Sequence, residues 1–122
     1  MLSDLRERVL AAFAQADRLA LVTYGPAGLQ LSLCPCGVLD KQLYVRVIQT
    51  SEHLPNLEQD SQVLAVTDTW RLRAHAEPVT DALTGSRLNQ QAWETLLRLQ
   101  PISMEFINPD GQTASETIDL DP

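Results

Sequence analysis

Lysine is almost missing from this chain, and positive charge is scarce throughout it. Of the 122 residues, one is lysine (Lys41) and eight are arginine, against 16 acidic residues, for a formal net charge of −7. A protein that binds a nucleic-acid duplex needs a basic face to displace counterions, so we expect no nucleic-acid partner. The same shortage argues against a polyphosphate ligand. A single phosphate could still be held by backbone amides together with Arg46 or His53.

Cysteine and histidine are equally few, and this argues against a metal site. The two cysteines, Cys34 and Cys36, stand in a CPCG run, and His53 and His75 are the only histidines. Two cysteines without further partners do not make a structural zinc site, and a disulfide between residues two apart is strained. We therefore expect no metal, and we expect both cysteines to be small buried apolar side chains.

Long apolar runs are also missing, which bears on the setting of the chain. No stretch approaches the roughly 20 apolar residues that a membrane span needs. The N-terminal MLSDLRER carries charges where a signal peptide needs its apolar segment. We expect a cytoplasmic protein with no membrane partner, and 122 residues predict a single domain over 1–122.

The most informative stretch is Gln42–Leu57, QLYVRVIQTSEHLPNL. Its first half is rich in β-branched and aromatic residues and predicts a strand. A polar turn follows, in which Thr50 and Ser51 are N-cap residue types, and the chain restarts as a short helix. Such a junction can bring backbone N–H groups, hydroxyls and a protonated His53 to one point, which favours a phosphate site. The alternative is an ordinary capped helix with a solvent-exposed histidine.

The rest of the chain predicts a small antiparallel β protein with peripheral helices. Short turns favour antiparallel pairing, because parallel strands need long crossovers. A barrel fits best, and a flat α+β sandwich is the alternative. Along 29–34 the leucines alternate with Gln30, Ser32 and Cys34, and along 71–77 charged residues alternate with apolar ones. The predicted helices cover 3–17, 54–57 and 86–100, the last ending at Pro101, and the predicted strands cover 18–24, 29–37, 42–48, 62–68, 71–79, 102–107 and 112–120.

The order of these elements carries a family resemblance. The segments LALVT, SLCP, LYVRV leading into TSEHLPNL, DSQVLAV, Trp70 with LRAHAEPV, and PISMEF follow one another as in the FMN-binding split-barrel family, which includes pyridoxamine 5′-phosphate oxidase. The chain resembles that family over nearly its whole length. The run His53–Leu57 is particularly similar to the branch that contains haem-utilisation proteins. The resemblance implies a six- to seven-stranded antiparallel split β-barrel of Greek-key type.

The resemblance also implies a homodimer with FMN in a groove between the subunits. Carried over by position, Ser32, Leu33 and Cys34 would run beside the flavin ring. Arg46 would help to balance the phosphate charge. The ribityl phosphate would lie at Val47, Thr50, Ser51 and His53, and Trp70 and Arg73 of the other subunit would close the groove. No catalytic residue is identified.

The phosphate turn leaves three functions open. Flavin-binding members usually offer a lysine or arginine there, whereas this chain has Glu52, His53 and Pro55. Glu52 would repel a phosphate unless Arg46 or an arginine of a second subunit compensates. The first function is an FMN-dependent oxidoreductase of unknown small-molecule substrate. Such an enzyme needs no Ser-His-Asp, Cys-His or paired-carboxylate set, and we find none in the sequence. The others are a haem-binding protein using His53, His75 or a cysteine thiolate, and a cofactor-free dimer acting as a binding or regulatory module.

Overall fold

The structure, a computed structural model, describes residues 2–107 and 117–119 and consists mainly of strands. The predicted turn at 108–111 and the residues 112–116 lie outside the described part. In chain order the elements are α1 (Leu2–Gln15), β1 (Arg18–Thr23), β2 (Gln30–Leu39), β3 (Gln42–Ile48), α2 (His53–Gln59), β4 (Gln62–Val66), β5 (Trp70–Val79), α3 (Ala82–Arg87), β6 (Glu94–Phe106) and β7 (Thr117–Asp119).

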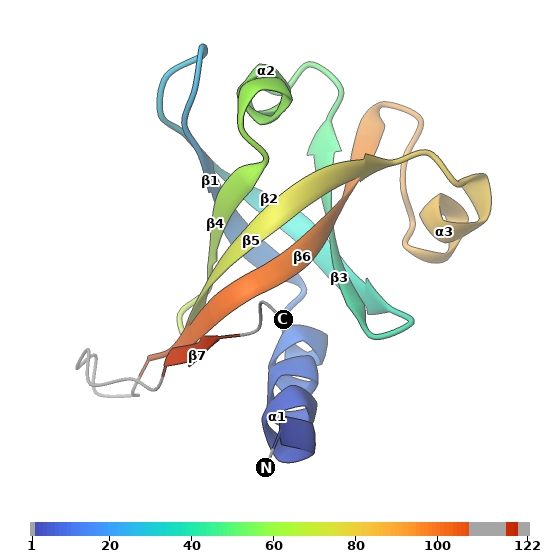
Figure 1. Ribbon diagram of the computed structural model, residues 1–122. Coiled ribbons are helices and arrows are strands. Elements are labelled where there is room, and N and C mark those ends of the chain that lie inside the picture. Colours follow the sequence, from blue (N-terminus) through green and yellow to red (C-terminus); the bar gives the residue numbers. More distant parts are fainter. Residues whose placement is uncertain (1, 108–116, 120–122) are drawn as a thin grey trace.

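The strands form a closed antiparallel barrel (Figure 1). Their order is β3-β2-β1-β4-β5-β6-β7, and β3 also pairs with β6, which closes the first six strands into a ring. β7 adds to the edge of β6 through Met104↔Ile118. The predicted split-barrel fold is therefore confirmed, and the flat sandwich is wrong. The turn between β2 and β3 is tighter than predicted, since only Asp40 and Lys41, at φ 52° and 66°, connect the two strands.

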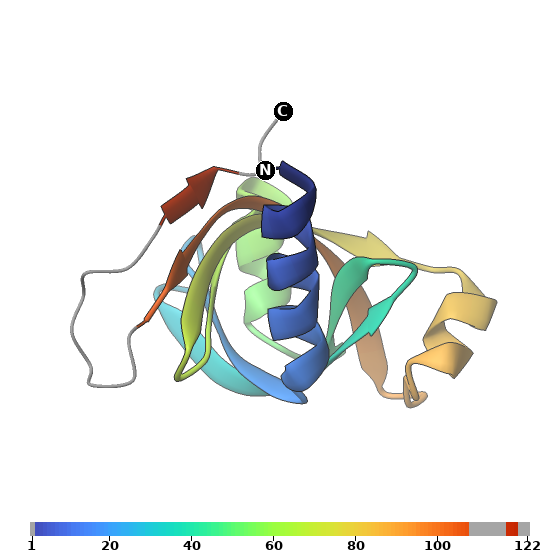
Figure 2. The same cartoon turned by 90° about the horizontal axis from the view of Figure 1, so that it is seen from below.

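The barrel interior holds the alternate apolar residues of every strand of the ring, and α1 lies across one end (Figure 2). α1 buries Val9 and Phe13, which lie on one apolar stripe of the helix. Phe13 contacts Trp70 edge to face, with ring centroids 5.4 Å apart. Burial of an aromatic side chain of this size stabilises the fold by about 1.5–3 kcal/mol. α1 is thus fastened to the barrel by its apolar stripe.

The predicted helix over 86–100 is wrong, as is the predicted loop over 80–85. α3 ends at Arg87, and β6 begins at Glu94 and continues through Pro101 to Phe106. The leucine-rich run fits a helical period as well as a strand. Pairing decides between them, because β6 lies between β3 and β5 and is hydrogen-bonded on both edges. Pro101, which has no N–H to donate, lies where the β5–β6 register shifts.

One face of the sheet carries exposed leucines. The predicted alternation along β2 is confirmed, but the leucine side points outward: Leu31 and Leu33 are 69% and 64% exposed. Leu64 of β4 is also exposed and faces Leu31 across β1, since Val22 pairs with both. β4 is therefore covered on one face only within this chain. We call Leu31, Leu33 and Leu64 the outer leucine face.

Candidate functional site

The candidate site is a pocket where β2 and β3 part. These strands pair only from Cys36↔Val45 to Leu39↔Gln42. Beyond that point residues 30–35 pair with β1 and residues 46–48 pair with β6. Pro35 stands at the fork and offers no backbone N–H to extend the ladder.

The opening holds a cavity of about 390 Å³, here called the fork pocket. It brings together eight of the ten residues to which the resemblance gave a cofactor-binding role: Ser32, Leu33, Cys34, Arg46, Val47, Thr50, Ser51 and His53. Its other lining residues are Gln30, Pro35, Ile48, Glu52 and Glu94.

The remaining two predicted residues lie elsewhere in the chain. Trp70 is 1% exposed and packs on Phe13, so it belongs to the barrel core and is not placed to close a groove. Arg73 is exposed on β5, where its Nε lies 3.3 Å from Ser103 Oγ. Glu94 is not among the predicted site residues, because it lies in the run 86–100 that its period predicts as a helix. The pairing of Ile48 with Glu94 is what brings this carboxylate to the pocket.

A buried clasp joins α2 to the β1–β2 hairpin. Asn56 is fully buried; its Nδ2 donates to Thr23 Oγ1 (3.0 Å) and to the Gly28 carbonyl (2.9 Å). Its Oδ1 accepts from the Ala27 N–H at 2.9 Å. His53, three residues earlier on the same face, contacts Thr23 Oγ1 through Nδ1 at 2.7 Å. Because α2 has only seven residues, these contacts rather than helix propensity hold it in place.

His53 is a neutral structural histidine, and the expectation of a protonated or solvent-exposed imidazole is wrong. It is 1% exposed, and its Nε2 lies 3.0 Å from Ser32 Oγ, so both ring nitrogens are engaged. Burial lowers the pKa of His53 below its ordinary value. The cap position of α2 is Glu52, whose side chain makes no cap bond, rather than Thr50 or Ser51. Ser51 Oγ still accepts the His53 N–H at 3.1 Å.

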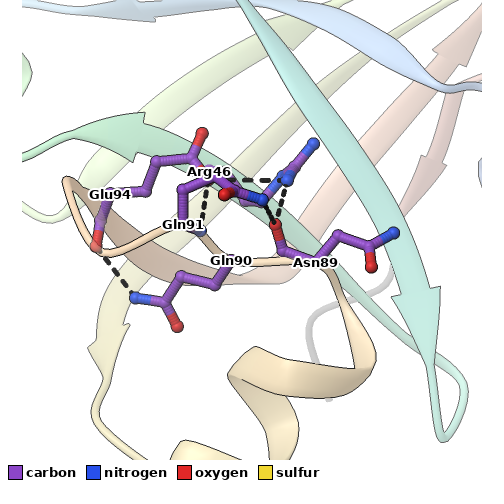
Figure 3. A network of polar contacts seen from close by, with 5 residues as sticks. All are labelled: Arg46, Asn89, Gln90, Gln91 and Glu94. Carbon is purple, nitrogen blue, oxygen red and sulfur yellow. Dashed lines mark hydrogen bonds and ion pairs between the residues drawn. The ribbon is translucent and has the colours of Figure 1, made fainter.

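Among the described residues that line the fork pocket, Arg46 is the only cation, and it is already engaged (Figure 3). Its guanidinium donates to the Asn89 carbonyl and lies 3.4 Å from Glu94 Oε1. Glu94 also accepts the Gln91 N–H at 2.8 Å, which ties the arginine to the segment before β6. With Glu52 exposed nearby and His53 neutral, the lining carries one positive and two negative charges. The pocket has donors for an anion but no surplus of positive charge.

The thiols are poor candidates for ligands. Burial raises the pKa of Cys34 to about 11, and burial with the Asp17 and Cys34 charges raises that of Cys36 to about 11. Both remain protonated at neutral pH, and a metal or haem iron binds the thiolate. Within residues 2–107 and 117–119, no three His, Cys, Asp or Glu side chains are placed to hold a metal ion. None of the helices in that part has the length and apolar character to cross a membrane.

The solved structures with a similar fold include two groups of proteins. No protein-family model matches the sequence, and no curated protein sequence matches it significantly. General stress protein 26 from Bacillus anthracis superposes with a TM-score of 0.71 at 16% identity, over 95% of this chain and 98% of that one.

Two further structures have a similar fold. A Clostridium acetobutylicum protein of the pyridoxine phosphate oxidase family, related to general stress protein 26, gives 0.72 at 12% identity, over 96% and 94%. The haem storage protein HutZ from Vibrio cholerae gives 0.57 at 23% identity, over 78% and 89%. The chain shares the fold of the family and of the haem-utilisation branch that the sequence resembled.

Proposed function

We propose that the fork pocket binds FMN and that the chain is a flavoprotein oxidoreductase acting on an unidentified small molecule. One observation carries the proposal: eight residues assigned to FMN by sequence position meet at one pocket. Along residues 30–35, β2 pairs with β1 on one edge, and the pairing with β3 begins only at Cys36. This stretch can offer backbone N–H and C=O groups to the polar edge of a flavin ring.

The end of the fork pocket that would hold the phosphate of FMN has suitable hydrogen-bond donors but lacks a surplus of positive charge. Thr50 is exposed, and Ser51 Oγ, which accepts the His53 N–H, retains its own O–H to donate. The contact of Arg46 with Glu94, at 3.4 Å, is loose for an ion pair, so the guanidinium can keep its bond to the Asn89 carbonyl and present its other N–H groups to a phosphate. Glu52 and Glu94 oppose a dianion, so we expect a second copy of the chain to supply further positive charge.

The outer leucine face is the surface on which we expect that second copy to pack. Exposed leucines concentrated on one sheet face indicate an interaction surface. Leu33 belongs both to this face and to the fork pocket. Leu64 pairs with Arg73, so a copy seated on this face carries its Arg73 to the edge of the same surface. A homodimer of this kind would place that arginine near the partner's pocket, in the role that the resemblance implies.

A bound flavin supplies hydride or electron transfer, and the protein needs only to bind, orient and shield it. In this chain the β2 edge orients the ring, and the turn at Thr50–Ser51 holds the ribityl phosphate. Pro35 and Val47 present apolar surface that excludes water from the ring.

The test is an absorption spectrum of protein purified from a flavin-replete host, followed by titration with FMN. We expect a flavin spectrum, or quenching of FMN fluorescence on binding. Ser51→Glu, which adds negative charge to the phosphate turn, should weaken binding at least tenfold, and Lys41→Gln at the far β2–β3 turn should not. Colourless protein together with unchanged FMN fluorescence would refute the proposal. Equal affinity in Ser51→Glu and the parent would place the phosphate elsewhere.

Haem is the second candidate, and the exposure of His75 favours it. His75 lies on the outer side of β5, where Nδ1 contacts Ser61 Oγ at 2.9 Å. His53 is buried and engaged at both nitrogens, so His75 is the accessible imidazole. A Soret band on adding haemin that disappears in His75→Ala would support haem binding. An unchanged melting temperature with FMN, haem and a deazaflavin would instead favour the cofactor-free module.

A further inference from the structure

A line of polar atoms runs from the interior to the wall of the fork pocket. Asn56 Nδ2 donates to Thr23 Oγ1 at 3.0 Å, Thr23 Oγ1 lies 2.7 Å from His53 Nδ1, and His53 Nε2 lies 3.0 Å from Ser32 Oγ. Thr23, His53 and Asn56 are at most 3% exposed. Ser32 is half-buried and lines the pocket. We call Thr23, His53 and Ser32 the hydroxyl relay.

The direction in which hydrogen bonds are donated along this relay follows from Asn56, at its interior end. The Asn56 amide cannot be reversed, because Oδ1 accepts from the Ala27 N–H and Nδ2 donates to the Gly28 carbonyl. Nδ2 must therefore donate to Thr23. If His53 carried its proton on Nδ1, Thr23 Oγ1 would accept from both neighbours, and its O–H would find no acceptor in the described residues. Leaving a buried hydroxyl unpaired costs about 1–3 kcal/mol.

The other tautomer satisfies every group. Thr23 then donates to Nδ1, and the Nε2–H of His53 donates to Ser32 Oγ. Ser32 Oγ then accepts the hydrogen bond from His53 Nε2–H, so its own O–H is free to donate into the pocket. The same distances could suggest a Ser-His nucleophile, but that arrangement needs Nε2 as the proton acceptor and a carboxylate on Nδ1. The direction of the relay makes Ser32 a donor instead.

Few charges face the relay to disturb it. Thr23 comes from β1 and Ser32 from β2, and the ionisable group nearest on β2 is Cys34, a protonated thiol. On the pocket side stand Arg46, Glu52 and Glu94. None of these three makes a hydrogen bond with a relay member among the described residues, so the relay stays neutral near pH 7.

We infer that Ser32 is a directed hydrogen-bond donor of the fork pocket, and that His53 is the positioning residue that directs it. The pocket then selects a ligand with an acceptor at that place, namely a carbonyl oxygen or an unprotonated ring nitrogen. The ring carbonyls of a flavin meet this requirement, and that identification rests on the proposed function. The tautomer of His53 does not rest on it.

The tautomer can be measured without any ligand. Long-range ¹H–¹⁵N NMR of the full chain at pH 7.5 distinguishes Nδ1–H, Nε2–H and doubly protonated imidazoles. There are two histidines, so a His75→Gln variant assigns the signals. We expect His53 to be neutral with its proton on Nε2. An Nδ1–H tautomer, or an imidazolium, would overturn the relay.

The donor role is measured with riboflavin, a neutral flavin whose binding does not depend on the phosphate turn. Ser32→Ala should weaken riboflavin about tenfold, and Ser32→Thr, which keeps a hydroxyl, should restore most of the affinity. Urea midpoints of both variants check that they fold. Equal affinity of the parent and Ser32→Ala would overturn the donor role. A parent protein that binds neither FMN nor riboflavin would refute the proposed function and the flavin as ligand. The NMR measurement of the His53 tautomer would still show whether the hydrogen bonds of the relay run in the inferred direction.

Discussion

Replacing Asn56 by alanine should cost far more stability than its place in a short helix suggests. The change deletes three hydrogen bonds, to Thr23 Oγ1, the Gly28 carbonyl and the Ala27 N–H. Each such bond contributes about 1 kcal/mol, and a partner left buried costs more. We expect the free energy of unfolding to fall by about 3 kcal/mol. With a urea m-value of about 2 kcal/mol/M for a chain of this size, the midpoint should fall by about 1.5 M.

A second substitution tests whether the geometry is right. A Cβ added at Gly25 would lie 2.8 Å from Asn56 Oδ1 and 3.0 Å from its Cα. Gly25→Ala should therefore destabilise the parent, and less so the Asn56→Ala variant, where the oxygen is gone. The double variant should be more stable than the sum of the single effects by at least about 0.5 kcal/mol.

The assay is urea unfolding followed by circular dichroism and by tryptophan fluorescence, whose change on unfolding comes mainly from buried Trp70, since Trp93 is already 61% exposed in the folded chain. Glu58→Ala, an exposed position on the same helix, is the matched control and should change the midpoint little. If Asn56→Ala moved the midpoint no further than Glu58→Ala, the clasp would not be what holds α2 against the hairpin. Strict additivity with Gly25→Ala would show that Asn56 Oδ1 is not the atom that a Cβ at position 25 meets.

Four further results are expected. Because burial lowers the pKa of His53, the imidazole of the unfolded chain is protonated at a higher pH than that of the folded chain. The free energy of unfolding should therefore fall as the pH drops below 6.5, by up to about 1.4 kcal/mol per pH unit. Urea titrations at pH 5–7.5 measure this slope, which should be smaller in His53→Gln. Cys34 and Cys36, with pKa values raised from 9.0 to about 11, should react with iodoacetamide about 100-fold more slowly at pH 8 in the native protein than in urea; equal rates would contradict their burial. Leu31→Glu on the outer leucine face should turn the proposed dimer into a monomer in sedimentation velocity, and a parent that is monomeric at 50 µM (about the top of that assay's range) would refute the dimer. Glu94→Gln, which removes the negative charge beside Arg46 at nearly constant shape, should tighten FMN about threefold and leave riboflavin unchanged; tighter riboflavin would show that charge is not the cause.

Local sequence pattern was sufficient for much of this molecule. Alternation along 71–77 predicted which side of β5 is buried, and the strand, turn and short helix over 42–57 lie where their residue types predicted. These features depend on neighbours in sequence, so a single chain reveals them. Element order carried the resemblance, which correctly implied the barrel. Eight of the residues that the resemblance named line the fork pocket.

Other features were settled by partners far away in the chain. The run before Pro101 fits two periods, and only pairing with both β3 and β5 makes it a strand. His53 looked like a solvated imidazole because its partners, Thr23 and Ser32, are 30 and 21 residues away. Trp70 looked like a groove residue, yet α1 covers it.

The sequence by itself determined where the strands alternate, because that follows from local side-chain order. Eight of the residues that border the fork were named only through the family resemblance, which the order of the elements carried. Tertiary structure alone decided the state of those residues: which imidazole is buried and neutral, which carboxylate engages Arg46, and which leucines are left outside. Burial and pairing depend on distances between strands, and these exist only once the barrel has closed.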